Sequence, residues 1–158
     1  MTGLTETADA TQPTSEFNAV LVSNLMCLAR YLLPPDDRSL SEAELTEMVE
    51  EEKCLHAPTR TMVLRFRLIE RIIEIHREAL TAELSKLRFS PDQRQLNYSS
   101  LPRLGSEYPP STPCFSLLHR LILVMRLREQ YSVRGCSLLL QTSDAVTEEV
   151  FQHAISRL

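Results

Sequence analysis

The chain has 158 residues, of which 43% are hydrophobic and 24% are charged, as in an ordinary soluble globular protein. Glycine is scarce at three residues while leucine is abundant, which disfavours a many-turned all-β fold and favours helices. Three glycines also cannot build a glycine-rich phosphate-binding loop. The net charge is uneven, because residues 1–56 carry eleven acids and three bases (net −8) and residues 57–158 carry ten acids and fourteen bases (net +4).

The first fifteen residues are short, polar and rich in Thr, Ala and Glu, so we expect residues 1–15 to form a disordered tail. This acidic start is unlike a basic, apolar targeting segment. The sequence has no run of eighteen apolar residues that could cross a bilayer, and its four cysteines lie far apart. These features predict an intracellular protein with reduced thiols and no membrane insertion, in either the cytoplasm or the nucleus.

Two helices are predicted in the first third of the chain. Residues 17–33 are mostly apolar and predict a buried helix that two following prolines terminate. Ser41 and Glu44 have the spacing of a capping box, in which each side chain caps a backbone N–H of the other residue. The capping box predicts the start of an acidic amphipathic helix that runs to about Cys54.

Residues 59–88 predict one long central helix. At about 100° per residue its apolar side chains form two neighbouring stripes over roughly half of the circumference, so at least two other elements should contact it. Arg65 and Glu83 interrupt this apolar face about 27 Å apart along the axis, so each needs a partner from another element or another chain. We therefore take both as candidate partner-binding residues. The first stripe consists of Met62, Phe66, Ile69, Ile73, Leu80, Leu84 and Leu87. The second stripe consists of Leu64, Leu68, Ile72, Ile75, Ala79 and Ala82.

Residues 90–113 contain five prolines and no helical period. A connection of this length inside a compact domain is usually functional or a linker. Prolines hold the backbone extended, so the segment could lie in a groove of a partner at a reduced entropic cost. The alternative is a loop folded back over its own domain. The apolar and aromatic residues of this arm, which are further candidate partner-binding residues, are Leu96, Tyr98, Leu101, Leu104 and Tyr108.

The remaining third of the chain is again helical in pattern. Residues 116–131 are strongly apolar, and a last helix follows Asp144, which can cap it. The short apolar run at 133–141 fits either a short strand or one buried helical turn. Taken together, the pattern predicts an all-α fold, a bundle of about five helices around the long central helix 59–88. We expect residues 16–158 to form a single domain with the arm at 90–113.

Cysteine and histidine lie close together in two places, Cys54 with His56 and Cys114 with His119. With two further cysteines they outline one conceivable zinc site, but structural zinc usually takes closer-set pairs than these. The sequence also has no Gly-x-Ser-x-Gly, Cys-x-x-Cys or His-Glu-x-x-His motif. We therefore predict no metal, no cofactor and no catalytic residue, and a protein that is not an enzyme.

The predicted function is a non-catalytic helical protein–protein interaction module, an adaptor or a subunit of a larger intracellular complex. It would bind a partner protein or a second copy of itself. The alternative is a helical nucleic-acid-binding module that uses the arginines of the C-terminal two-thirds, because arginine outnumbers lysine fifteen to two. Nucleic-acid binding needs a dense basic face, however, and here the bases are interspersed with acids.

Overall fold

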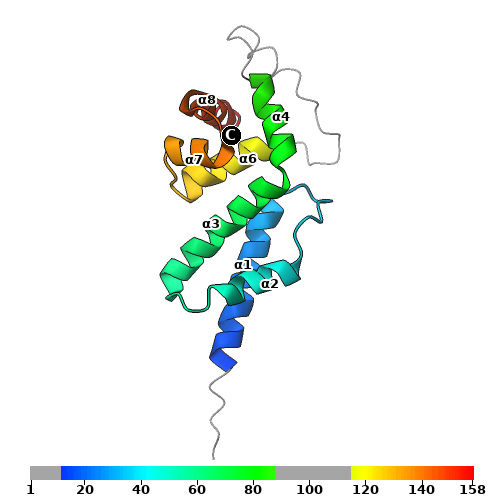
Figure 1. Cartoon of the computed structure of the whole chain (residues 1–158), viewed down its shortest axis with the longest axis vertical. Coiled ribbons are helices and arrows are strands. Elements are labelled where there is room, and N and C mark those ends of the chain that lie inside the picture. The colour runs from blue at the N-terminus through cyan, green and yellow to red at the C-terminus, as the bar shows by residue number, and fades with distance from the viewer. Residues whose placement is uncertain (1–11, 88–114) are drawn as a thin grey trace, which may run out of the picture. The chain divides into compact units, whose positions relative to one another are not determined.

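The computed structural model describes residues 12–87 and 115–158. Within these ranges the regular elements are all helical, which confirms the predicted all-α class (Figure 1). There are seven α-helices and one π-helical segment, η1, in the described residues. Their bounds are α1 Gln12–Leu32, α2 Glu42–Glu51, α3 Ala57–Ile75, α4 Arg77–Leu87, α6 Leu117–Leu123, η1 Val124–Arg128, α7 Val133–Leu140 and α8 Asp144–Ile155.

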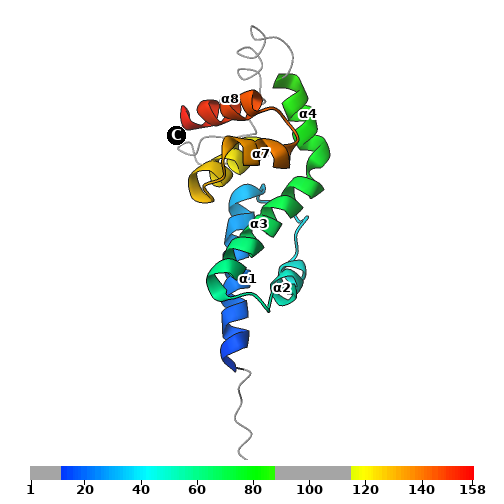
Figure 2. The same cartoon turned by 60° about the vertical axis from the view of Figure 1, so that its left-hand side comes forward.

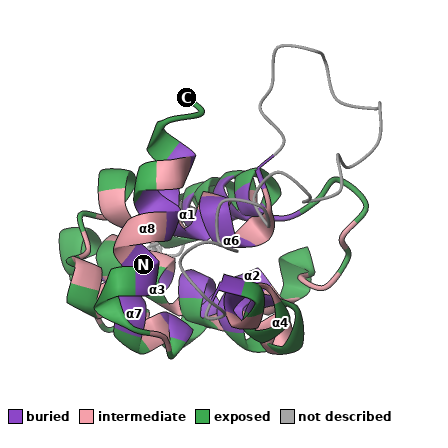
Figure 3. Ribbon diagram, turned by 90° about the horizontal axis from the view of Figure 1, so that it is seen from above, coloured by how far each residue is buried: buried purple, intermediate pink, exposed green. Residues whose placement is uncertain are grey.

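The described helices divide into two compact units. Unit 1 comprises Met1–Tyr31 and Pro35–Leu68, and therefore holds nearly all of α1, all of α2 and the first part of α3. Unit 2 comprises Leu32–Pro34 and Ile69–Leu158, and holds the rest of α3 and the later helices. Most of the described helices carry both buried and exposed residues, whereas α6 has only buried and half-buried ones (Figure 3). None of the described helices is apolar over a length that would span a bilayer.

In unit 1, α1, α2 and the first part of α3 lie side by side (Figures 1 and 2). The capping box at the start of α2 is confirmed, because Ser41 Oγ accepts a hydrogen bond from the Glu44 N–H (3.2 Å) and Glu44 Oε2 accepts one from the Ser41 N–H (2.9 Å). Arg60 joins α3 to α2, since its Nη2 donates to the backbone oxygen of Val49 at 2.6 Å. Helix α1 begins at Gln12, five residues before the predicted start.

The prediction of one continuous helix over residues 59–88 is wrong. The chain forms α3 and α4, which are separated by a turn at His76 and meet at a bend (Figures 1 and 2). Backbone hydrogen bonds still cross the turn, from His76 N to Ile72 O (3.1 Å) and from Leu80 N to His76 O (3.0 Å). Arg77 donates to the backbone oxygen of Leu139 at 3.2 Å, so tertiary contacts within unit 2 override the local helical period here.

Only one of the two apolar stripes stays buried after this bend. Ala79 and Ala82, which would continue the second stripe into α4, are exposed, whereas Leu80, Leu84 and Leu87 of the first stripe are buried. Helix α4 therefore buries one stripe where the uninterrupted helix would have buried two. The structure gives no support to a bundle arranged around one long central helix.

In unit 2, α6 packs against α8 and α4, and α7 packs against α8. Of the two alternatives predicted for residues 133–141, the strand is wrong and the buried helical turn is closer, because residues 133–140 form helix α7 with Cys136 and Leu140 buried. The residue that caps α8 is Ser143 and not Asp144, since Ser143 Oγ accepts a hydrogen bond from the Val146 N–H at 3.3 Å. These local corrections leave the helical class unchanged.

Candidate protein-binding surface on helix α1

Helix α1 exposes a row of largely apolar side chains. Val20 is 55% exposed, Tyr31 53% and Phe17 37%, and the Cys27 thiol is exposed and free. The same helix buries Leu21, Leu25 and Leu28. We call the exposed row the α1 stripe, and it consists of Phe17, Val20, Asn24, Cys27 and Tyr31.

The α1 stripe has the spacing of a helix-binding seam. Its members follow one another at intervals of three, four, three and four residues, which are the a and d positions of a heptad. Single exposed apolar side chains are common on soluble proteins, but a row aligned on one helix face is what a second helix typically covers. At about 1.5 Å per residue the stripe is about 21 Å long. One end is held in place, because the Arg60 guanidinium lies 5.9 Å from the centroid of the Phe17 ring.

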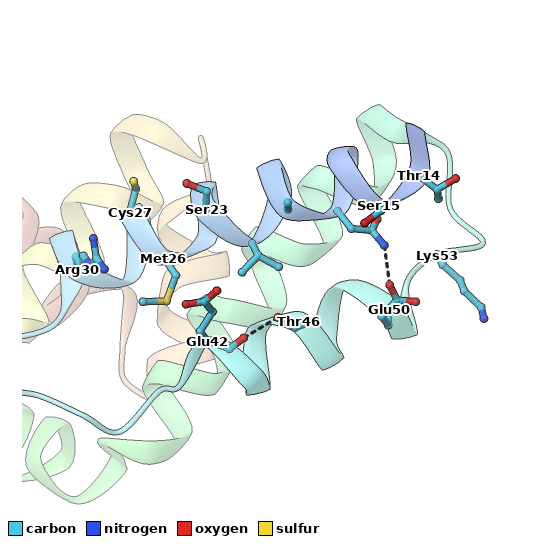
Figure 4. Close-up of a pocket in the computed structure, with 13 residues that line it drawn as sticks. Thr14, Ser15, Ser23, Met26, Cys27, Arg30, Glu42, Thr46, Glu50 and Lys53 are labelled. Carbon is cyan, nitrogen blue, oxygen red and sulfur yellow. Dashed lines mark hydrogen bonds between the residues drawn. The ribbon is translucent and has the colours of Figure 1, made fainter. Parts of the chain in front are cut away.

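A groove of about 680 Å³ runs between α1 and α2 and borders the α1 stripe at Cys27 (Figure 4). The hydrogen bond from Asn18 Nδ2 to Glu50 Oε1 (2.6 Å) crosses it. Its walls carry charges of both signs, with Arg30 and Glu42 toward one end and Lys53 beside Glu50 at the other (Figure 4). Hydroxyl side chains and the apolar Ala19, Val22 and Met26 line the remainder, so the groove can accept both polar and apolar side chains of a partner.

A chain of polar side chains joins three helices of unit 2. Ser116, which caps α6, donates from Oγ to Glu83 Oε1 on α4 at 2.6 Å. The same Oγ lies 2.7 Å from His119 Nδ1, and His119 Nε2 lies 3.1 Å from His153 Nδ1 on α8. The chain therefore links α4, α6 and α8 through four side chains.

Burial shifts the titration of these groups. Burial and the neighbouring His153 and Arg157 lower the pKa of His119 to about 4, so its ring is neutral at pH 7. Burial also raises the pKa of Glu83, although the Ser116 hydrogen bond and Lys86 oppose the shift. His119 is only 1% exposed, and the carboxylate contacts the serine rather than orienting the histidine as in a catalytic triad. This arrangement is suited to holding helices together.

The residues predicted from the sequence as partner-binding are distributed as follows. Arg65 is half-buried on α3 in unit 1. Glu83 is half-buried on α4 in unit 2, and its carboxylate accepts a hydrogen bond from Ser116, which lies on another element. The five residues of the arm, Leu96, Tyr98, Leu101, Leu104 and Tyr108, lie outside the described residues.

Several of the arginines behind the nucleic-acid alternative have internal partners. Arg67 is bonded to Glu51 (2.6 Å) and Glu52 (2.8 Å), and its hydrogen bond to Glu51 is the main reason that its pKa is raised. Arg126 donates to the backbone oxygen of Tyr131 (2.8 Å). In the described part of the chain, no group of three or more histidine, cysteine or acidic side chains could hold a metal ion. The geometry thus offers no observation that favours a nucleic-acid or metal site.

The α1 stripe was not among the residues singled out from the sequence. The many apolar residues of 17–33 predict a buried helix and do not by themselves indicate an exposed face. The signal that could have revealed the exposed face is the set of polar residues Ser23, Asn24 and Arg30, which fall on and beside the stripe. A buried helix would not carry them without partners.

Comparison with known proteins adds no relative: no family model, no curated protein and no solved structure matches the chain. Function is therefore inferred from the geometry of the described residues. Among the described helices, α1 carries the most exposed large hydrophobic side chains, Phe17, Val20 and Tyr31.

Proposed function

We propose that this protein is a non-catalytic helical interaction module, an adaptor or subunit of a larger intracellular assembly, that binds an α-helix of a polypeptide along the α1 stripe. The observation that carries the proposal is the alignment of Phe17, Val20, Cys27 and Tyr31 as exposed residues at heptad spacing. Covering apolar surface stabilises a complex by about 25 cal/mol per Å². A row of half-exposed side chains can therefore contribute several kcal/mol before the entropic cost of association.

The neighbouring groove supports the same function. A helix laid on the α1 stripe would present its flanking side chains to the groove at Cys27 and Arg30, which line it. Charges of both signs at its ends could select the orientation of a partner, because charge pairs at an interface contribute more to specificity than to affinity. The polar chain of unit 2 would hold its helices together and take no direct part in binding.

A photo-crosslinking amino acid in place of Val20 tests this function directly. Val20 and Leu138, the latter on α7 in unit 2, are comparably exposed at 55% and 63%, so Leu138 is the matched control position. The full chain with the crosslinker at position 20 should form a covalent adduct of defined mass in cells, and the chain with the crosslinker at position 138 should not form that adduct. The captured polypeptide is then identified, purified and titrated against the wild-type chain and Val20→Glu.

A weakening of at least tenfold by Val20→Glu, with Leu138→Glu unchanged, is the expected result, because a charge in the covered stripe must be desolvated. Equal adduct formation at both positions, or a partner affinity that Val20→Glu leaves unchanged, would show that the α1 stripe is not the binding surface. An adduct with a second copy of the chain and an adduct with a different polypeptide both agree with the proposed function.

A further inference from the structure

The two aromatic ends of the α1 stripe are equally spaced about its central residue. Asn24 lies seven residues after Phe17 and seven residues before Tyr31, so the two aromatic side chains are two helical turns away from it in opposite directions. Val20 lies four residues before Asn24 and Cys27 three residues after it, so the whole stripe is approximately symmetric. A surface with this symmetry can meet an identical surface across a two-fold axis, with each contact made twice.

Two opposite charges lie beside the stripe, one eight residues before Asn24 and one six residues after it. Glu16 and Arg30 occupy the same flanking heptad position, one before Phe17 and one before Tyr31, and both are exposed. Neither forms an ion pair within the described part of the chain. The residues on the other flank of the stripe, Leu21 and Leu28, are buried. Charged contacts to a second helix can therefore form on one flank only.

We propose that the helix covering the α1 stripe is the α1 helix of a second copy of this chain, in an antiparallel pair with Asn24 at the two-fold axis. This inference rests on the proposed function and names its partner. Phe17 would pack against the partner's Tyr31, and Glu16 would pair with the partner's Arg30, each contact occurring twice. Asn24 would bond the partner's Asn24 through their side-chain amides, each of which can both donate and accept.

The charge pattern selects the antiparallel orientation. In an antiparallel pair a two-fold axis brings the same flank of both helices together with its order reversed, so that Glu16 faces the partner's Arg30. In a parallel pair that flank would face Leu21 and Leu28 of the other helix, which are buried and offer no countercharge. Exposed ion pairs contribute at most about 1 kcal/mol each, so they fix orientation while the apolar residues supply affinity. A polar residue at a single a position similarly fixes register at a cost in stability.

The size of the stripe sets the expected strength of the dimer. About four turns of helix on each side make a contact at the small end of specific interfaces. We expect a dimer whose Kd lies in the micromolar range.

Light scattering during size exclusion of the full chain, loaded from a few micromolar to several hundred micromolar, should show a monomer giving way to a dimer. Val20→Glu should abolish the dimer, and the matched control Leu138→Glu should leave it intact.

Disulfide crosslinking tests the orientation. Cys27, Cys54 and Cys114 are replaced by serine, and single cysteines are introduced at positions 17, 24 or 31. The antiparallel pair should crosslink rapidly through Asn24→Cys, and poorly through Phe17→Cys or Tyr31→Cys alone. A mixture of the Phe17→Cys and Tyr31→Cys chains should crosslink to each other. Equally fast self-crosslinking at all three positions would mean a parallel pair and would overturn the proposed arrangement.

The outcomes separate this inference from the proposed function. A chain that stays monomeric up to several hundred micromolar, or a dimer that survives Val20→Glu, overturns self-association through α1. If the crosslinker at position 20 then captures a different polypeptide, binding through the α1 stripe stands and only the identity of the partner changes. Folding of each variant is checked by its far-UV spectrum and thermal melt, and an exposed position such as Val20 should melt as the wild type does.

Discussion

The Nε2 atom of His119 lies 3.1 Å from the Nδ1 atom of His153, and this contact restricts the protons that the two rings can hold. One nitrogen must donate and the other must keep its lone pair, so the two rings cannot both be protonated while the hydrogen bond persists. With both rings neutral, His153 donates to His119, His119 donates to Ser116, and Ser116 donates to Glu83. Every member of the chain then has a partner, and the acceptor at its end is a carboxylate.

The stability of the protein should therefore fall as the pH is lowered from about 6.5 to about 4. The pKa of His119 is lowered from 6.5 to about 4 in the folded chain, so between these values the unfolded chain binds more protons and acid favours unfolding. The loss attributable to His119 is on the order of 3 kcal/mol. His153, whose pKa burial and Arg157 also lower, acts in the same direction. Glu83 acts in the opposite direction, because its pKa is raised on folding.

Urea unfolding at a series of pH values measures this slope. His119→Asn should flatten it between pH 4 and 6.5, even if the variant is less stable at every pH. His56→Gln replaces an exposed histidine in unit 1 and should leave the slope as it is in the wild type. A slope that survives His119→Asn would assign the acid sensitivity to other groups.

Glu83→Gln should preserve the stability of the protein at pH 7 or raise it by up to about 1 kcal/mol. The Glu83 side chain is 19% exposed, and burial disfavours its charge. The amide keeps an oxygen that can accept the Ser116 hydrogen bond without a buried charge. Glu83→Leu removes the acceptor as well and should cost about 1 to 2 kcal/mol. Thermal melts of the two variants decide the matter, and a large loss with glutamine would show that the chain requires the carboxylate charge.

The helices that the sequence revealed are those whose signals are local. The capping box of Ser41 and Glu44 requires only four consecutive residues, and the structure has it with both hydrogen bonds. The short apolar run of α7 is ambiguous in period, so the sequence leaves a strand and a helical turn open, although Ser132 caps the helix by accepting a hydrogen bond from the Gly135 N–H (3.0 Å). A polar cap before a short run was the available sign of a helix.

The features that the sequence did not reveal depend on tertiary contacts. The turn at His76 divides a stretch whose apolar period favours one helix. Next to it, Arg77 donates a hydrogen bond to the backbone oxygen of Leu139, which lies 62 residues further along the chain. In α1, the sequence period shows where the apolar residues lie around the helix. It does not show which of these apolar faces is buried against the rest of the chain. Val20 and Leu21 are adjacent and both apolar, yet the first is 55% exposed and the second 4%. The polar residues Ser23, Asn24 and Arg30 indicate from the sequence that α1 has an exposed face, but which apolar residues share that face is known only once α1 is placed against its neighbours.

Arg60→Met should lower the free energy of unfolding by about 2 to 3 kcal/mol. The Arg60 side chain is 4% exposed and donates to the Val49 backbone oxygen near the end of α2, where carbonyl groups lack helical partners. It also lies over the Phe17 ring. Arg134→Met is the control, because Arg134 is exposed and its ion pair with Asp144 is long at 3.5 Å, so its loss should cost less than about 0.5 kcal/mol. Equal effects of the two substitutions in chemical denaturation would contradict this role for Arg60.

Gln141→Gly should raise the stability of the protein by about 0.5 to 1 kcal/mol. Gln141 ends α7 in the left-handed conformation, with φ 55° and ψ 47°, which glycine adopts without the steric cost that a Cβ atom brings. The next residue closes the helix end, since the Thr142 N–H donates to the Ser137 oxygen at 3.0 Å, and this bond does not involve the glutamine side chain. Gln141→Ala removes the same side chain but keeps the Cβ atom, so the difference between the two variants isolates the backbone contribution. In thermal melts the glycine variant should unfold at a higher temperature than the alanine variant, and the reverse order would show that the left-handed residue is not a source of strain.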